Sequence, residues 1–389
     1  MTVSHDLILF GATGFTGGLV ADYLAAASAR EPLRWALAGR NAAKLAAVRA
    51  RVAAVPGAVL PDLVVADVED SASLRALAGS TRAVITTVGP YALYGEPLLR
   101  ACAEAGTHYV DLTGEPHFVQ TMRRKYDAVA RASGARIVNS AGFESIPPDI
   151  TVLQAVRELQ RRLGPAFVNA EVVVKGGAEG FSLPSGGTWH SAVHAMAGVR
   201  DWLRDRSPAP RDAVETLRTP LLRENDWGCW AINAPTIDPE VVRHSARLRG
   251  DYGRRFRYGH FVANRSALAL AGLVAGLGGV FALAQFGPTR RWLLQQRQPG
   301  DGPDAEARGK GWFHLHVTAE AAGEKVVLRM HGGDPFYGDT AKMIGEAGLA
   351  LALEKNLPPA AGVITPAAAI GELLVPRLAR AGIVIEILA

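Results

Sequence analysis

The chain has 389 residues, of which 49% are hydrophobic and 20% are charged, and its formal net charge is +5. This composition excludes a disordered chain, and the length favours two domains over one. Only 7 of the 42 basic residues are Lys and no dense basic run occurs, which argues against a nucleic-acid partner.

Two further features restrict the class of protein. Cys102 and Cys229 form no CxxC pair, so neither a disulfide scaffold nor a zinc site is expected. The residues after Met1 show no basic region followed by a long apolar one, so we expect no signal peptide and a cytoplasmic protein.

A strand, a glycine-rich turn and a helix come first in the chain. DLILF (6–10) is apolar, GATGFTGG (11–18) follows, and a helical pattern continues through LVADYLAAA. Glycines at this spacing allow a sharp turn, a close approach to a pyrophosphate and tight helix–sheet packing. The turn and the first helical N–H groups are therefore predicted to bind a dinucleotide, through Gly11, Thr13, Gly14, Phe15, Thr16 and Gly17.

The second strand, 33–41, ends in Gly39-Arg40-Asn41. NAD-preferring sites usually place a carboxylate there for the ribose 2′-hydroxyl. Arg40, with Lys44 one turn later, suits a 2′-phosphate instead, so NADP(H) is predicted as the cofactor. The alternative is that Arg40 is a solvated residue at the end of a strand.

Strands and helices then alternate up to residue 145, which predicts a doubly wound parallel sheet of the Rossmann type. The predicted strands are 63–68, 82–91, 108–115 and 135–145, and the predicted helices are 97–106 and 117–133. Ligands bind outside the carboxyl ends of such strands. We therefore expect Asp67 to meet the adenine, and Val88, Gly89 and Tyr91 to lie beside the cofactor.

The second half of the chain predicts a substrate domain, 148–355, after a nucleotide-binding domain, 1–147. A helix at 146–164, a strand at 167–176, a helix at 185–199, a hairpin at 312–333 and a helix at 337–355 indicate an α+β domain with a mixed or antiparallel sheet. His190 and His194 lie one helical turn apart, but no H-E-x-x-H motif surrounds them, so no metal is expected.

Four blocks in this order resemble the saccharopine dehydrogenase-like oxidoreductases, and more narrowly their trans-acting enoyl reductase branch. The blocks are GATGFTG, AGRN, VGPYALYGEPLLRACAEAGTHYVDLTGE and NSAGFESIPPD, and GVITPAAAIGELLVPRLARAGI near the end is also similar to that branch. The resemblance implies that 356–389 returns to the nucleotide domain. The branch often has Cys-Gly-Phe-Asp-Ser where this chain has Ala141 to Ser145, with Glu144 in place of the aspartate.

Enoyl reduction, the activity that the resemblance implies, delivers hydride to a β carbon and a proton to the α carbon. Tyr91, Glu115 and Glu144 are candidate catalytic residues because each lies at the carboxyl end of a strand of the predicted sheet. The alternative for each is structural: a tyrosine that stacks on the nicotinamide, or carboxylates that bind backbone N–H groups.

An uncharged run of eighteen residues, ALALAGLVAGLGGVFALA (267–284), lies within the predicted substrate domain. Its bulky residues recur at helical spacing, its four glycines weaken a helix, and arginines flank it at both ends. Three interpretations stay open: a buried or substrate-lining segment, peripheral docking on the inner face of the membrane, and a spanning helix.

Taken together, the sequence predicts an NADPH-dependent oxidoreductase that reduces a carbon–carbon double bond in a lipid or polyketide-derived substrate. A saccharopine-type amino-acid or imine dehydrogenase is the alternative within enzymes, and a non-catalytic, membrane-docked NADP-binding protein is the alternative outside them. Whether the chain forms a homodimer stays open.

Overall fold

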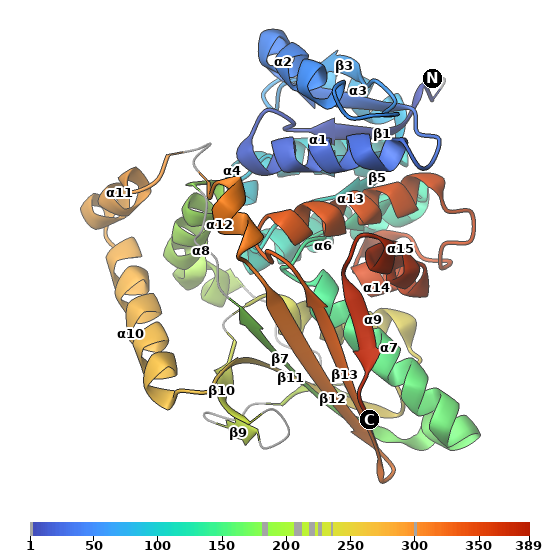
Figure 1. Ribbon diagram of the computed structural model, residues 1–389, viewed down its shortest axis with the longest axis vertical. Coiled ribbons are helices and arrows are strands. Elements are labelled where there is room, and N and C mark those ends of the chain that lie inside the picture. The colour runs from blue at the N-terminus through green and yellow to red at the C-terminus, as the bar shows by residue number, and fades with distance from the viewer. Residues whose placement is uncertain are drawn as a thin grey trace.

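The computed structural model describes residues 3–180, 186–205, 212–217, 222–224, 228–234, 236–298 and 302–389. Two β-sheets form its framework, a parallel sheet A with helices on both faces and a mixed sheet B below it in Figure 1. The predicted fold class, a Rossmann-type sheet with a second α+β part, is confirmed.

Sheet A contains seven strands, all parallel, in the order β14-β6-β5-β4-β1-β2-β3. Its strands are β1 (His5–Phe10), β2 (Trp35–Gly39), β3 (Asp62–Val65), β4 (Thr81–Thr86), β5 (His108–Val110), β6 (Arg136–Val138) and β14 (Gly362–Ile364). The helices that connect them are α1 (Phe15–Ser28), α2 (Ala42–Val52), α3 (Ser71–Gly79), α4 (Tyr91–Tyr94), α5 (Glu96–Ala105) and α6 (Pro116–Ser133).

Both faces of sheet A are covered, which explains why its inner strand β1 is apolar without alternation. Leu7 and Leu9 of β1 pack with α1 and with α13 (Gly338–Leu353), whereas Ile8 and Phe10 pack with α3, α5 and α6. All four side chains are buried. The strand is therefore held by two apolar layers at once.

Sheet B has the order β15-β13-β12-β7-β11-β10-β9, with β8 paired to β11. Its strands are β7 (Glu171–Gly180), β8 (Val214–Thr216), β9 (Leu222–Glu224), β10 (Cys229–Asn233), β11 (Arg255–Asn264), β12 (Phe313–Ala321), β13 (Glu324–Gly332) and β15 (Val384–Ile387). β12 and β13 form the predicted antiparallel hairpin, whereas β7 and β11 run parallel. The sheet is therefore mixed.

The chain passes between the two sheets more than once. After β6, α7 (Ile146–Leu163) packs on β12 and β13, and α9 (Asp238–Arg249) packs on β11. α13 and β14 then join sheet A, although α13 falls within the predicted substrate domain, and β15 ends the chain in sheet B. The connecting elements α14 (Pro366–Ala369), η2 (Gly371–Leu373) and α15 (Leu374–Arg380) lie between β14 and β15.

Several predicted strands end earlier than expected. The strand predicted at 82–91 ends at Thr86, and those predicted at 108–115 and 135–145 end at Val110 and Val138. The remaining residues form the loops at the carboxyl edge, where side chains rather than neighbouring strands satisfy the backbone. The strand predicted at 167–176 is also displaced, because 164–169 is the 3-10 helix η1 (Gly164–Asn169) and β7 begins at Glu171.

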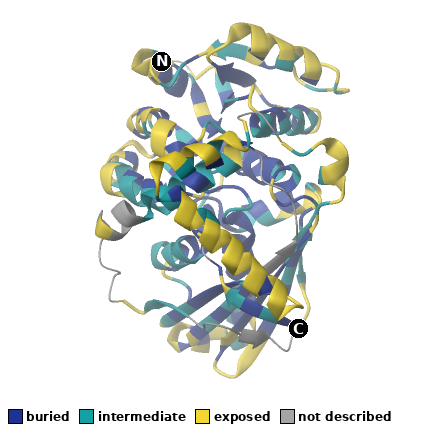
Figure 2. Cartoon of the chain, turned by 90° about the vertical axis from the view of Figure 1, so that its left-hand side faces the viewer, coloured by how far each residue is buried: buried dark blue, intermediate teal, exposed yellow. Residues whose placement is uncertain are grey.

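The apolar run is one helix, α10 (Ala267–Ala284), beside α8 (Gly186–Asp205) and α11 (Gly287–Gln295). Ser266 caps its N-terminus by accepting a hydrogen bond from the Ala269 N–H at 3.3 Å. Only 11% of the helix is buried, so the interpretation as a buried core segment is wrong. Figure 2 views the molecule from this side, where the helix is almost wholly exposed.

Candidate active site at the carboxyl edge of sheet A

The glycine-rich turn between β1 and α1 has a shape that only glycine permits. Gly11 adopts φ +92°, and a Cβ there would lie 2.7 Å from Val88 Cγ2. A Cβ on Gly17 would overlap the carbonyl oxygen of Gly11, because the first turn of α1 packs directly on the turn before it. These two positions therefore explain the spacing of the motif in steric terms.

The N-terminus of α1 opens at this turn. Gly14 is its N-cap and has no side chain that could accept a hydrogen bond from the helix, and the first turn contains no acidic residue. The first N–H groups of a helix have no partner within the helix. Thr13 and Gly14 are exposed, and Phe15 and Thr16 are partly exposed, so this end of α1 fits the pyrophosphate of a dinucleotide.

The end of β2 supplies exposed cations. Gly39 is its last residue, Arg40 and Lys44 are exposed, and neither forms an ion pair within the described residues. The Asn41 side chain accepts a hydrogen bond from the Lys44 N–H at 3.0 Å and so begins α2 at this point. Arg40 and Lys44 therefore fit a 2′-phosphate at the position that the sequence predicted.

Asp67 follows β3, and both its carboxylate and its backbone N–H form hydrogen bonds with nearby residues. Its Oδ1 accepts a hydrogen bond from the Glu69 N–H at 3.1 Å, while its own N–H contacts Ser73 Oγ at 3.2 Å. The carboxylate therefore shapes the turn before α3, beside the edge at which the adenine is expected.

Tyr91 begins α4 just after β4, Val88 and Gly89. Its hydroxyl donates to the Thr86 carbonyl at 3.1 Å and accepts from the Leu112 N–H at 3.1 Å. The side chain is 5% exposed, and burial raises the pKa of the phenol, so it stays protonated. The structure thus places Tyr91 at the cofactor edge with its hydroxyl engaged by the backbone.

Glu115 is buried beneath the same helix. Its carboxylate accepts hydrogen bonds from the N–H groups of Tyr91 at 3.0 Å and Ala92 at 2.9 Å. Burial raises its pKa, whereas these backbone bonds and the Ser191 hydroxyl of α8 lower it. Glu115 therefore joins α4 to α8, a contact that no local pattern in the sequence indicated.

Glu144 differs from the other two candidates because part of its carboxyl is without a partner. Its side chain is half-buried, and its Oε2 is buried without a hydrogen-bond partner among the described residues. Burial, together with the charges of Asp238 and Asp111, raises the pKa of Glu144 to about 8. The carboxyl is therefore mostly protonated at neutral pH.

Asp111 and Asp238 are the two carboxyls whose charges act on the pKa of Glu144. Asp111 accepts hydrogen bonds from the Ser140 N–H at 2.9 Å and from Asn139 Nδ2 at 2.6 Å, which ties the loops after β5 and β6 together. Asp238, on α9, lies 3.9 Å from His260 Nε2 of β11. Sequence reasoning missed Asp238 and His260, because nothing local distinguishes them from residues of an ordinary helix and strand.

The histidines considered as metal ligands have other contacts. His190 Nε2 lies 3.0 Å from the Leu294 carbonyl and 2.9 Å from the Arg297 carbonyl, so it joins α8 to the segment around α11. Over the described residues, no group of three or more His, Cys, Asp or Glu side chains has a geometry that would hold a metal.

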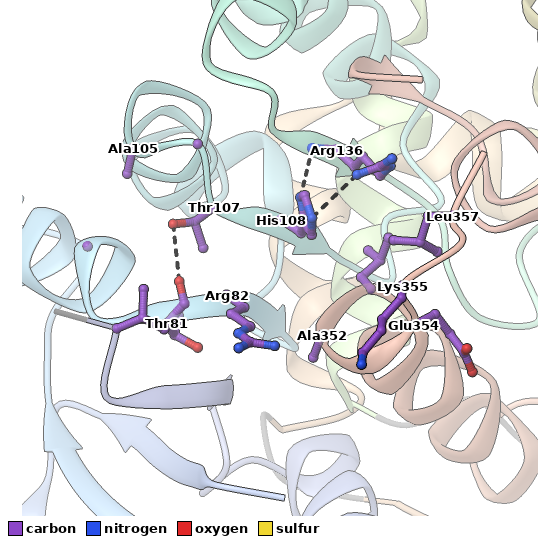
Figure 3. A pocket seen from close by; sticks show the side chains of 14 residues that line it. Thr81, Arg82, Ala105, Thr107, His108, Arg136, Ala352, Glu354, Lys355 and Leu357 are labelled. Atoms are coloured by element: carbon purple, nitrogen blue, oxygen red, sulfur yellow. Dashed lines mark hydrogen bonds between the residues drawn. The ribbon is translucent and has the colours of Figure 1, made fainter. Parts of the chain in front are cut away.

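A cavity of about 680 Å³ lies at the opposite, amino-terminal edge of sheet A. Figure 3 shows Arg136 against His108, with Arg82 and Lys355 nearby. Ligands of doubly wound sheets bind beyond the carboxyl ends of the strands. This cavity lies at the other edge and is therefore separate from the cofactor loops.

Comparison with known proteins agrees with this geometry. The saccharopine dehydrogenase NADP binding domain family matches residues 7–138. A Mycobacterium tuberculosis protein whose name assigns it to the trans-acting enoyl reductases is 37% identical over 98% of this chain and 97% of its own. A Mycobacterium leprae protein named trans-acting enoyl reductase is 34% identical over 98% and 97%.

The chain belongs to the trans-acting enoyl reductase family. It is an NADP-dependent oxidoreductase, as the family resemblance and the cations Arg40 and Lys44 predicted. The structure of saccharopine dehydrogenase from Saccharomyces cerevisiae aligns over 98% of this chain and 99% of its own, with a TM-score of 0.52 and 11% sequence identity. This chain therefore shares its overall fold with saccharopine dehydrogenase.

Proposed function

We propose that the protein uses NADPH to reduce the carbon–carbon double bond of an α,β-unsaturated acyl group in a lipid or polyketide-derived substrate. Relatives that share nearly the whole chain are named for enoyl reduction. The observation that carries the proposal in this chain is Glu144, whose buried Oε2 has no partner within the described residues and whose pKa is raised to about 8.

In this proposal, the cofactor supplies hydride when it is bound between the glycine-rich turn and the loops after β4, β5 and β6. Arg40 and Lys44 hold its 2′-phosphate. The protonated Glu144 carboxyl gives its proton to the α carbon, where hydride addition at the β carbon leaves negative charge. Tyr91 and Glu115 fix the loop geometry through their bonds to Thr86, Leu112 and α4.

Local charge favours this reaction over that of a saccharopine-type enzyme. Asp111, Glu115 and Glu144 gather at the carboxyl edge of sheet A, and none of them forms a salt bridge within the described residues. A substrate with several carboxylates would need paired cations there. A neutral enoyl group would not.

Glu144→Gln tests the proposal, because the amide keeps the shape of the side chain but is not an acid at this pH. We expect kcat with NADPH and a long-chain trans-2-enoyl thioester to fall by about 10²- to 10⁴-fold while NADPH affinity is unchanged. Glu104→Gln, on the exposed end of α5, is the matched control and should retain full activity. A Glu144→Gln enzyme with unchanged kcat would refute the assignment.

The pH dependence provides a second readout of the same group. The acid form of Glu144 is present below its pKa of about 8, so wild-type kcat should decline as pH rises through about 8. Since the pKa of Glu144 in the folded state lies above the ordinary value of a glutamate carboxyl, the folded state binds this proton more tightly than the unfolded state does. The contribution of this proton to the free energy of unfolding is complete below the ordinary pKa of a glutamate and is lost as pH rises through about 8. Glu144→Gln should remove this pH dependence.

A further inference from the structure

We propose that α10 and α11 dock the protein on an anionic phospholipid bilayer, with α10 lying flat in the headgroup region. This surface is separate from the cofactor edge, and the proposal does not depend on which substrate the enzyme reduces.

α10 is apolar on all sides and the rest of the protein leaves it uncovered. Its mean hydropathy is 2.2 and only 11% of it is buried. Leu270 and Ala284 are its only buried residues. A helix that is apolar all round is normally covered by a protein core or by lipid. Exposed large apolar side chains continue along α10 and α11, namely Leu268, Leu273, Val274, Leu277, Phe281, Leu283, Phe286 and Trp292.

The attachments of α10 exclude a spanning helix. Its N-terminal end follows β11 of sheet B, and at its C-terminal end Ala284 packs on Val193 of α8. Gln285 Nε2 donates to the Met196 carbonyl at 3.0 Å, and Trp189 Nε1 donates to the Leu293 carbonyl at 2.6 Å. Both ends are thus joined to one body, whereas a spanning helix places its ends on opposite sides of a core about 30 Å thick.

Charge selects a bilayer as the partner. Residues 252–300 contain seven Arg and no Asp, Glu or Lys. Arg265 precedes α10, while Arg290 and Arg291 lie on α11, and Arg265 and Arg291 are exposed. Pairing with a second copy through α10 would bring these arginines together without a compensating carboxylate in this segment. Anionic headgroups would neutralise them.

Aromatic residues mark the turn that would lie at the lipid–water boundary. Phe286 is 65% exposed and Trp292 is 53% exposed, close to the arginines of α11. Trp at this kind of position is typical of membrane interfaces. Since α8 packs on α10 and α11 while its Ser191 bonds to Glu115, docking would hold the carboxyl edge of sheet A near the bilayer.

The test is flotation of the full-length protein with phosphatidylcholine vesicles that contain or lack phosphatidylglycerol. We expect the protein to float with the anionic vesicles and to bind phosphatidylcholine alone about tenfold more weakly. Val274→Asp/Leu277→Asp should weaken binding to the anionic vesicles by about tenfold or more. Arg290→Gln/Arg291→Gln should weaken it by about tenfold and lower its sensitivity to salt.

Val129→Asp/Val168→Asp is the matched control, because both valines are exposed and lie on α6 and η1 rather than on α10 or α11. It should float as the wild type does, and every variant should keep its NADPH affinity, which shows that it is folded. Wild-type protein that stays at the bottom of the gradient would overturn the proposal. So would equal flotation of the α10 variant, or a lipid-free dimer that this variant dissociates.

Discussion

Sheet A, which carries the cofactor edge, and the α8–α10–α11 layer differ in how far their apolar side chains are buried. Leu7, Ile8 and Leu9 of β1 are fully buried between two helical layers. α10 is also apolar, with a mean hydropathy of 2.2, yet Leu268 is 82% exposed and Val274 is 53% exposed. Composition alone therefore does not reveal whether a segment is covered by its own protein.

The two regions also differ in what holds them. At the cofactor edge, side chains and backbone are interlocked: Glu115 bonds to α4, Asp111 bonds to the loop after β6, and Gly17 packs on Gly11. α10 is held at its two ends, by a cap at Ser266 and by contacts around Ala284. Changes that break these interlocked contacts at the first region should therefore disturb cofactor binding, and changes at the second should leave it intact.

The largest expected effect on cofactor affinity is that of Gly17→Ala. The added Cβ would overlap the Gly11 carbonyl oxygen and force α1 away from the turn. Overpacking of this kind lowers the free energy of unfolding by roughly 1–3 kcal/mol. We expect about a hundredfold loss of NADPH affinity, measured by fluorescence titration. Gly198→Ala in α8 has nothing within 4 Å of its Cβ and should bind NADPH normally. Equal affinities would contradict the steric account of the motif.

An effect of comparable size or smaller, confined to NADPH, is expected from Arg40→Ala. Loss of a charge-assisted contact to the 2′-phosphate should cost roughly 1.5–3 kcal/mol in NADPH affinity and leave NADH affinity nearly unchanged. Isothermal titration with both cofactors measures the ratio. Arg75→Ala, an exposed arginine on α3, should not alter it. An unchanged preference for NADPH in Arg40→Ala would show that Arg40 is only a solvated residue at the end of β2.

The sequence predicted the cofactor edge because its signals are local. Gly11 and Gly17 are six residues apart, and their steric roles follow directly from the strand–turn–helix order. By contrast, the effect of Asp238 on the pKa of Glu144 and the hydrogen bond between Ser191 and Glu115 depend on tertiary packing that places α9 and α8 beside these carboxyls. The exposure of α10 was equally hidden, because the same apolar pattern suits a core, a lipid substrate and a membrane surface.

The most direct test of the central claim, enoyl reduction, uses NADPH that carries deuterium in place of the hydride it transfers. With a long-chain trans-2-enoyl thioester as substrate, the account predicts a saturated product that carries a single deuterium, located at the β carbon by mass spectrometry. An unlabelled or unreduced thioester, together with label transfer to an imino acid substrate, would contradict the account and favour an amino-acid dehydrogenase.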